Sequence, residues 1–139
     1  MNALLTLLFV LSIDPRLPAE ARAPLDIAAQ RWADTRTIPQ PLDITINFVP
    51  GSPACGISSS TCLASTRQRY DYSWDVRFNS IYDYYWGVDG NPSPGQIDFL
   101  SIVLHEYGHV MGLEHSRDPN NVMFNEFEYG KSYHGRELK

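Results

Sequence analysis

The chain has 139 residues, enough for one domain with one hydrophobic core. Hydrophobic residues make up 43% of it and charged residues 19%, which excludes the composition of a disordered protein. Its 11 basic and 16 acidic residues give a net charge of −5, which argues against a nucleic acid or an anionic membrane as partner.

The N-terminal residues 1–13 are an apolar run that is too short to span a membrane as a helix. Small-residue sites at 19–21 and 21–23 would make residues 1–23 a signal peptide, although no basic residue precedes Arg16. This interpretation predicts a secreted, extracellular protein. The alternative is an apolar N-terminal strand or helix that is kept in the mature fold.

A helix is predicted at 24–35, because Pro24 suits a first turn and the apolar residues that follow lie mostly on one side. Residues 43–49 alternate polar and apolar side chains, as a half-buried strand does, and Pro50 ends the pattern. The first part of the chain therefore predicts a helix followed by a strand.

Two more strands are expected, one within 62–70 and one at 75–79, where polar and apolar residues alternate again. The aromatic residues 81–86 fit either a strand or an ordered loop, and 87–95 are rich in turn residues. With the preceding helix and strand, this pattern predicts an α+β fold.

Cys55 and Cys62, the two cysteines of the chain, lie in a loop rich in glycine and serine. In a secreted protein they would form a disulfide that closes this loop. In an intracellular protein they would be two reduced thiols. A metal site is disfavoured because no second pair of cysteines or histidines lies nearby.

The pattern His-Glu-x-x-His-x-x-Gly-x-x-His occupies residues 105–115. On a helix, His105 and His109 lie about 40° apart around the axis, which lets both imidazoles reach one metal ion. Gly112 can adopt a positive φ, end the helix and bring His115 back as a third ligand. Three histidines leave the fourth coordination position of a zinc ion open, as a catalytic site requires.

The same helix is expected to begin near Asp98, a candidate N-cap, and to bury the face opposite the histidines. That face carries Ile97, Leu100, Val103, Leu104, Tyr107, Val110 and Met111. Glu106 lies about 100° around the axis from His105, beside the metal, where it suits a base acting on water better than a third ligand.

Several other polar residues are weaker candidates. His134 and Glu114 are expected to be solvent-exposed and not to bind metal. A calcium site could involve Asp83, Asp89, Asn91 and Asp98, but turn chemistry explains these residues equally well.

The histidine motif followed by a methionine resembles the signature of the metzincin metalloproteases. Ser116 directly follows the third histidine and Met123 comes eight residues after His115, which resembles the matrixin branch, in particular its microbial members. The resemblance is most specific over 95–124 and extends back to about residue 24.

This resemblance implies a single metzincin-like domain over 24–139, with a twisted mixed sheet backed by two helices and one catalytic Zn²⁺ at the second helix. It implies that Met123 packs beneath the histidines, that a sheet edge strand pairs with an extended substrate, and that a pocket is lined by Phe124, Asn125, Glu126 and Phe127. Asn125 stands where astacin-type enzymes have a tyrosine ligand, so no fifth ligand is expected. The family's C-terminal helix is expected to be reduced or truncated, with a short helical turn near 135–138.

The function implied is a monomeric zinc-dependent endopeptidase that cleaves proteins or peptides, with Glu106 as general base. The alternative is a catalytically inactive zinc-binding module that acts by binding protein. The short C-terminal segment favours this alternative, whereas Glu106, which an inactive relative could lose, argues against it. A third interpretation is a structural helix without metal.

Overall fold

A computed structural model of the chain describes residues 8–51 and 62–139. In these ranges the chain forms β1 (Phe9–Ile13), the short 3₁₀ helix η1 (Ala19–Ala21), α2 (Arg22–Thr35), β2 (Leu42–Val49), β3 (Ala64–Gln68), β4 (Trp74–Asn79), β5 (Tyr84–Tyr85), β6 (Ile97–Asp98) and α4 (Phe99–Val110). The predicted α+β fold, with a mixed sheet and two helices, is confirmed. The predicted helix and all three predicted strands are present, each within two residues of its expected bounds.

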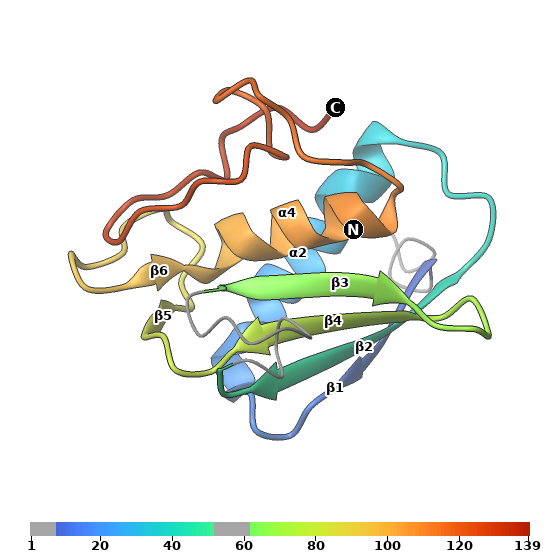
Figure 1. The fold of residues 1–139 in the computed structure, drawn as a ribbon, viewed down its shortest axis with the longest axis horizontal. Helices are drawn as coiled ribbons and strands as arrows, with labels where there is room; N and C mark the ends of the chain where they lie inside the picture. The colour runs from blue at the N-terminus through green and yellow to red at the C-terminus, as the bar shows by residue number, and fades with distance from the viewer. Residues whose placement is uncertain (1–7, 52–61) are drawn as a thin grey trace.

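The main sheet has the strand order β1-β2-β4-β3 (Figure 1). β1, β2 and β4 are parallel, whereas β3 is antiparallel to β4 and forms one edge. The register places Ile46 beside Val76, and both side chains are fully buried beneath the helices. The aromatic stretch that fitted either a strand or a loop contains β5, which pairs with β6 in a second, two-stranded sheet.

The N-terminal strand β1 pairs with β2 along its whole length, from Phe9 beside Leu42 to Ile13 beside Ile46. The Phe9 ring is buried, and its centroid lies 5.2 Å from that of Tyr107 on α4. This arrangement matches the alternative of an apolar strand kept in the fold. The removal of residues 1–23 as a signal peptide stays a prediction, and it would take β1 out of the sheet.

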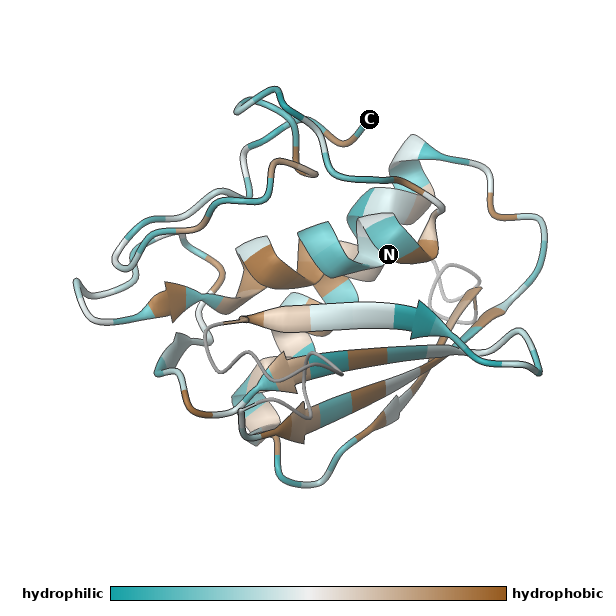
Figure 2. Cartoon of the chain, in the orientation of Figure 1, coloured by the Kyte–Doolittle hydropathy of each residue, from teal (hydrophilic) through white to brown (hydrophobic). Residues whose placement is uncertain are grey.

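Helices α2 and α4 cover one face of the sheet, and the Trp32 indole nitrogen of α2 joins them by donating a 2.9 Å hydrogen bond to the carbonyl of Leu104 (Figure 1). The face of α4 that was predicted to be buried is buried except at Met111, and the histidine side is largely buried as well, because every residue of 99–108 is buried. The sheet and α2 cover one side of α4, and the largely hydrophilic segment that follows the helix covers the other (Figure 2).

Asp98 is the N-cap residue of α4, as predicted, but its side chain makes no capping hydrogen bond. Its Oδ2 atom instead accepts hydrogen bonds from the hydroxyls of Ser101 (2.6 Å) and Ser132 (3.0 Å). The Ser101 hydroxyl also accepts a 2.7 Å bond from the backbone N–H of Tyr133. The buried carboxylate therefore attaches the C-terminal segment to the start of α4.

The C-terminal segment, residues 111–139, contains turns and two isolated bridges and is not helical. The predicted helical turn near 135–138 is wrong, since this stretch forms a hydrogen-bonded turn closed by Arg136 N and Tyr133 O. The Arg136 guanidinium lies over three aromatic rings, at 4.0 Å from the centroid of Tyr133, 5.3 Å from Phe124 and 5.4 Å from Phe127. This stacking holds the segment together.

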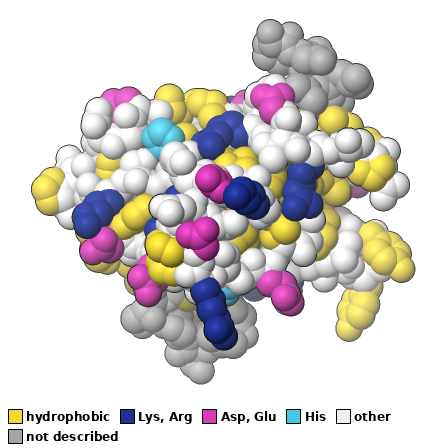
Figure 3. All heavy atoms as spheres, turned by 90° about the horizontal axis from the view of Figure 1, so that it is seen from above, with side chains coloured by type: hydrophobic (Ala, Val, Ile, Leu, Met, Phe, Trp, Pro, Cys, Tyr) yellow, Lys and Arg dark blue, Asp and Glu magenta, His cyan; other side chains and the backbone are white. Residues whose placement is uncertain are grey.

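Cys62 is disulfide-bonded, and Cys55, its predicted partner, lies outside the described residues. Within the described ranges, no helix is long and apolar enough to cross a membrane. Basic and acidic side chains are interspersed on the face shown in Figure 3.

Candidate metal centre

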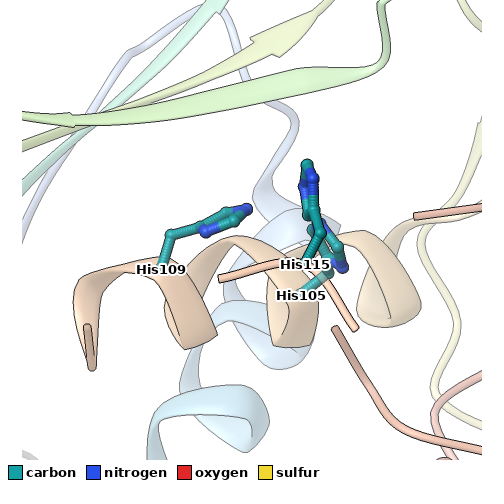
Figure 4. Close-up of side chains that lie close together, drawn as sticks. All are labelled: His105, His109 and His115. Carbon is teal, nitrogen blue, oxygen red and sulfur yellow. The ribbon is translucent and has the colours of Figure 1, made fainter. Parts of the chain in front are cut away.

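Three imidazoles converge at the C-terminal half of α4 (Figure 4). His105 and His109 come from the helix and His115 from the segment after it, and their ligand nitrogens all lie within 4.8 Å of one another. Nitrogens bound to one tetrahedral zinc lie about 3.4 Å apart, so small rotations of the rings suffice to close the site. Across residues 8–51 and 62–139, no other group of three His, Cys, Asp or Glu side chains comes as close.

The turn that brings His115 back is built on Gly112, whose φ of +90° lies in the region that favours glycine. The Gly112 N–H bonds to the carbonyl of His109, and the Leu113 N–H bonds to that of Gly108, both at 3.0 Å. These bonds satisfy carbonyls at the end of the helix while the chain reverses. The predicted role of Gly112 is confirmed.

Hydrogen bonds set the tautomers of the two helical histidines. Nδ1 of His105 lies 2.9 Å from the carbonyl oxygen of Val122, and Nδ1 of His109 lies 2.9 Å from that of Leu113. A carbonyl oxygen only accepts, so each Nδ1 donates its hydrogen and each Nε2 keeps a free lone pair. Two imidazoles oriented in this way fit a zinc ion.

The protonation of the same histidines also suits a metal. Burial lowers the pKa of His105 to about 4, and burial lowers the pKa of His109 as well. Both rings are therefore neutral at physiological pH, which is the form that binds a metal. The tautomers and the neutral charge of these two imidazoles therefore suit Zn²⁺, independently of the sequence motif.

Glu106 is buried between the helix and the sheet, with 5% of its surface exposed. Its Oε1 atom accepts a 2.8 Å hydrogen bond from the hydroxyl of Thr66 on β3. Burial raises the pKa of the Glu106 carboxyl to about 7, and the Thr66 bond opposes this rise. Sequence reasoning missed Thr66, whose one signal was its place in a predicted strand.

A cavity of about 900 Å³ opens in front of the histidines, between β3 and residues 125–128. Its lining comprises residues 62–68, Trp74, Ile102, Glu106, His109, His115 and 125–128. Three of the predicted pocket residues, Asn125, Glu126 and Phe127, are part of this lining. The fourth, Phe124, is not, because its ring packs against Arg136 instead.

Met123 is buried, with 1% of its surface exposed, and its sulfur lies against Gly108, between the two helical histidines. The Phe127 ring packs edge-on against His105, with the two ring centroids 5.2 Å apart. β3, the edge strand expected to pair with a substrate, forms one wall of the cavity. One cavity therefore has two of the three histidines, His109 and His115, together with a buried carboxylate and a strand edge in its walls.

Among the described residues, the weaker candidates do not belong to the cluster of three histidines. Glu114 is exposed as predicted, but His134 is half-buried rather than exposed, and its carbonyl accepts a hydrogen bond from Arg31. Asp89 accepts hydrogen bonds from the Tyr85 hydroxyl and from the Asn91 N–H, which supports the turn-chemistry interpretation of these residues.

Two histidines on a helix, a third after a glycine turn and a methionine beneath them define the metzincin class. The chain belongs to the matrixin family, whose model matches residues 20–138.

Similar proteins come from a virus, a mammal and a plant. The chain is 53% identical to Probable matrix metalloproteinase 095L of Invertebrate iridescent virus 3 over 38 residues, which cover 27% of this chain and 9% of the viral protein. It is 40% identical to Matrix metalloproteinase-16 of Homo sapiens over 55 residues, 40% of this chain and 9% of that protein. It is 26% identical to Metalloendoproteinase 2-MMP of Arabidopsis thaliana over 134 residues, 86% of this chain and 35% of that protein. The matches thus span about a tenth to a third of these relatives.

Proposed function

We propose that the chain is a zinc-dependent metalloendopeptidase that hydrolyses peptide bonds in proteins or peptides, with one catalytic Zn²⁺. The observation that carries this proposal is the cluster of three imidazoles, two of which line the same cleft as the buried carboxylate of Glu106. Nε2 of His105 and of His109, together with His115, would hold the ion. When bound, zinc lowers the pKa of a water in its open position to about 7 and polarises the carbonyl of the scissile bond.

Glu106 would move the proton in this reaction. Thr66 holds one of its carboxylate oxygens and leaves the second to accept the proton of the attacking water. The same carboxyl then delivers the proton to the leaving amine. A pKa near 7 suits both steps at neutral pH. Because water is the nucleophile, the reaction requires no covalent enzyme intermediate.

The cleft itself favours a polypeptide as substrate. β3 is an edge strand, so its outer backbone groups can pair with an extended peptide while adjacent pockets take alternate side chains. Phe127 and the backbone of 125–128 form the opposite wall. Secretion as a monomer is part of the proposal, and the disulfide-bonded Cys62 supports it because disulfides persist in oxidising compartments.

The inactive binding module is the less favoured candidate. Glu106 is desolvated in the cleft and bonded to Thr66, an arrangement that suits proton transfer and that a binding module does not need. A module that only binds protein would gain nothing from keeping a buried carboxylate with a raised pKa.

Metal analysis and peptide cleavage test the proposal together. We expect one zinc per purified chain, cleavage of a quenched fluorescent peptide library, loss of cleavage with a chelator and recovery when zinc is added back. One bound zinc without cleavage of any peptide would establish the binding module instead. The absence of zinc from the purified chain and from zinc-supplemented protein would rule out both.

A further inference from the structure

A second hollow continues the cleft beyond His109. This cavity of about 550 Å³ shares Gln68 and Trp74 with the cleft in front of the histidines. The rest of its wall includes Pro41, Leu42, Asp43, Asp71, Tyr72 and Val110. We call it the hairpin pocket, because the turn between β3 and β4 forms one of its sides.

The hairpin turn presents Tyr72 at the rim of this pocket. Tyr72 has a φ of +69° and 80% of its surface is exposed. Its N–H bonds to the carbonyl of Arg69 at 3.0 Å, and its own carbonyl accepts a 3.1 Å bond from the side chain of Gln68. An aromatic residue in this backbone region is uncommon, and these bonds hold it there with its ring facing solvent rather than the core.

The charge of the hairpin pocket is negative. Asp43 and Asp71 line it, and its lining contains no Lys or Arg. Hydrogen bonds from Ser73 lower the pKa of Asp71, so this carboxyl is ionised at neutral pH. The nearby cation, Arg69, bonds to Thr45 (3.1 Å) and pairs with Asp75 (3.7 Å), and its charge also helps to lower the pKa of Asp71.

Apolar side chains complete the pocket, with Leu42, Trp74 and Val110 among them. A long basic side chain fits this mixture, since its aliphatic stem can lie on the apolar wall while its charged end meets the carboxylates and the face of Tyr72. A neutral or acidic side chain of the same length would bring no positive charge to Asp43 and Asp71.

The position of the pocket along a substrate follows from β3. We place the scissile bond beside Thr66, because Thr66 bonds to the proposed base Glu106. Gln68, which lines the pocket, lies two residues further along β3. A substrate strand that pairs antiparallel to β3, which is the more stable pairing, would have its N-terminal part beside Gln68. At about 3.3 Å per residue, the pocket then receives a side chain two to four residues before the scissile bond.

We propose that the hairpin pocket is a specificity subsite that binds an arginine or lysine two to four residues N-terminal to the scissile bond. The site rests on the proposed function for its place along the substrate. The carboxylates of Asp43 and Asp71 and the ring of Tyr72 are its recognition groups.

The test uses the full chain with Glu106→Gln, so that binding is measured without cleavage. Peptides carry either arginine or citrulline, which has the same length but no charge, at the second, third or fourth residue before the expected cleavage point. We expect arginine at one of these positions to lower Kd about fivefold relative to citrulline. Adding Asp43→Asn and Asp71→Asn should reduce this ratio to about one and leave the Kd of the citrulline peptide unchanged.

Asp83→Asn is the matched control, because Asp83 is exposed and lies outside both cavities. It should keep the fivefold preference. An arginine preference that survives the double substitution would overturn the proposal, as would equal binding of arginine and citrulline peptides at all three positions.

Cleavage of the citrulline peptides by the unsubstituted chain reports on the proposed function separately. If these peptides are not cleaved but the preference in Kd is found and is lost in the double variant, the recognition of a basic side chain by the pocket stands, and the enzymatic proposal and the place of the pocket relative to a scissile bond fail. If they are cleaved without any preference, the enzyme stands and the subsite fails.

Discussion

The sulfur of Met123 occupies the space that a side chain at Gly108 would need. A Cβ atom built on Gly108 would lie 2.2 Å from Met123 Sδ and 3.2 Å from Cζ2 of Trp32. Gly108 lies on α4 between His105 and His109, so the methionine packs directly against the backbone that carries the two candidate ligands. The glycine is required here for close approach rather than for backbone freedom.

We therefore expect Gly108→Ala to destabilise the protein by about 1–3 kcal/mol, although alanine favours a helix by about 1 kcal/mol over glycine. Denaturant unfolding and zinc titration measure the loss of stability and the accompanying fall in zinc affinity. If the clash with sulfur is the cause, Gly108→Ala should cost less in a Met123→Ala background. Strictly additive effects of the two substitutions would contradict this packing argument.

Glu106→Gln separates metal binding from proton transfer. The amide keeps the size of the side chain but cannot accept a proton from water, so we expect retention of one zinc and a fall in kcat/KM by several orders of magnitude. Zinc content and cleavage of a quenched peptide are the two measurements. Cleavage at the unsubstituted rate would rule out Glu106 as the base.

Thr66→Val tests how the base is held. Valine keeps the shape of threonine and removes the 2.8 Å bond to Glu106, and the loss of a bond to a charged group costs about 1.5–3 kcal/mol. We expect kcat to fall about ten- to hundredfold with zinc content unchanged. The matched control is Thr35→Val, the same change at an exposed residue of α2 that does not line the cleft, and it should keep kcat. An unaltered kcat in Thr66→Val would show that the bond does not orient the carboxylate.

The contrast between Thr66 and the histidines shows how far sequence reasoning reaches in this fold. His105 and His109 are related by helical spacing, and Gly112 signals the turn to His115. Rules that act over a few residues were therefore enough to predict this cluster. The bond between Thr66 and Glu106 spans 40 residues and depends on the position of β3 against α4, which no local pattern encodes.

The features that sequence reasoning did not reach have the same origin. Asp98 is the N-cap residue of α4 as predicted, but its carboxylate bonds to Ser101 and the distant Ser132 instead of capping the helix. Phe124 was expected in the pocket, but it stacks on Arg136, whose position no motif predicted. For the N-terminal run, composition alone could not separate a signal peptide from a strand, because both are apolar.

Asp14 predicts how stability depends on pH. A side-chain hydrogen bond from Arg16 holds the pKa of its carboxyl well below the usual range, and a bond from the Phe48 N–H on β2 acts in the same direction. Because the folded-state pKa is depressed, this stabilisation is fully present above the unfolded pKa of about 3.9 and is lost as pH falls toward the folded value.

We expect Asp14→Asn to lower the free energy of unfolding by about 1 kcal/mol at pH 7. The difference in the free energy of unfolding between the two proteins should become smaller as the pH is lowered below about 4. Urea unfolding of both proteins from pH 7 to pH 3 measures this difference. A difference that stays constant with pH would mean that the charge of Asp14 does not contribute.

Arg136 is expected to fix the wall of the cleft. Its guanidinium donates to the carbonyl oxygens of Phe124 (3.3 Å) and Glu126 (3.2 Å) while it stacks on Tyr133. These two carbonyls flank Asn125, which lines the cleft, so one side chain holds both ends of that stretch. Lysine keeps the charge but cannot bond to both carbonyls with a planar fork.

We therefore expect Arg136→Lys to raise KM about tenfold, with kcat and zinc content nearly unchanged, because two hydrogen bonds of about 1 kcal/mol each are weakened away from the metal. Amide hydrogen exchange should accelerate in 124–128 and stay slow in α4. Arg117→Lys is the control, because Arg117 is exposed and lines neither cavity. Unchanged exchange in 124–128 would show that the aromatic rings hold the wall without the guanidinium, and a loss of kcat with KM preserved would place Arg136 in the support of the histidines instead.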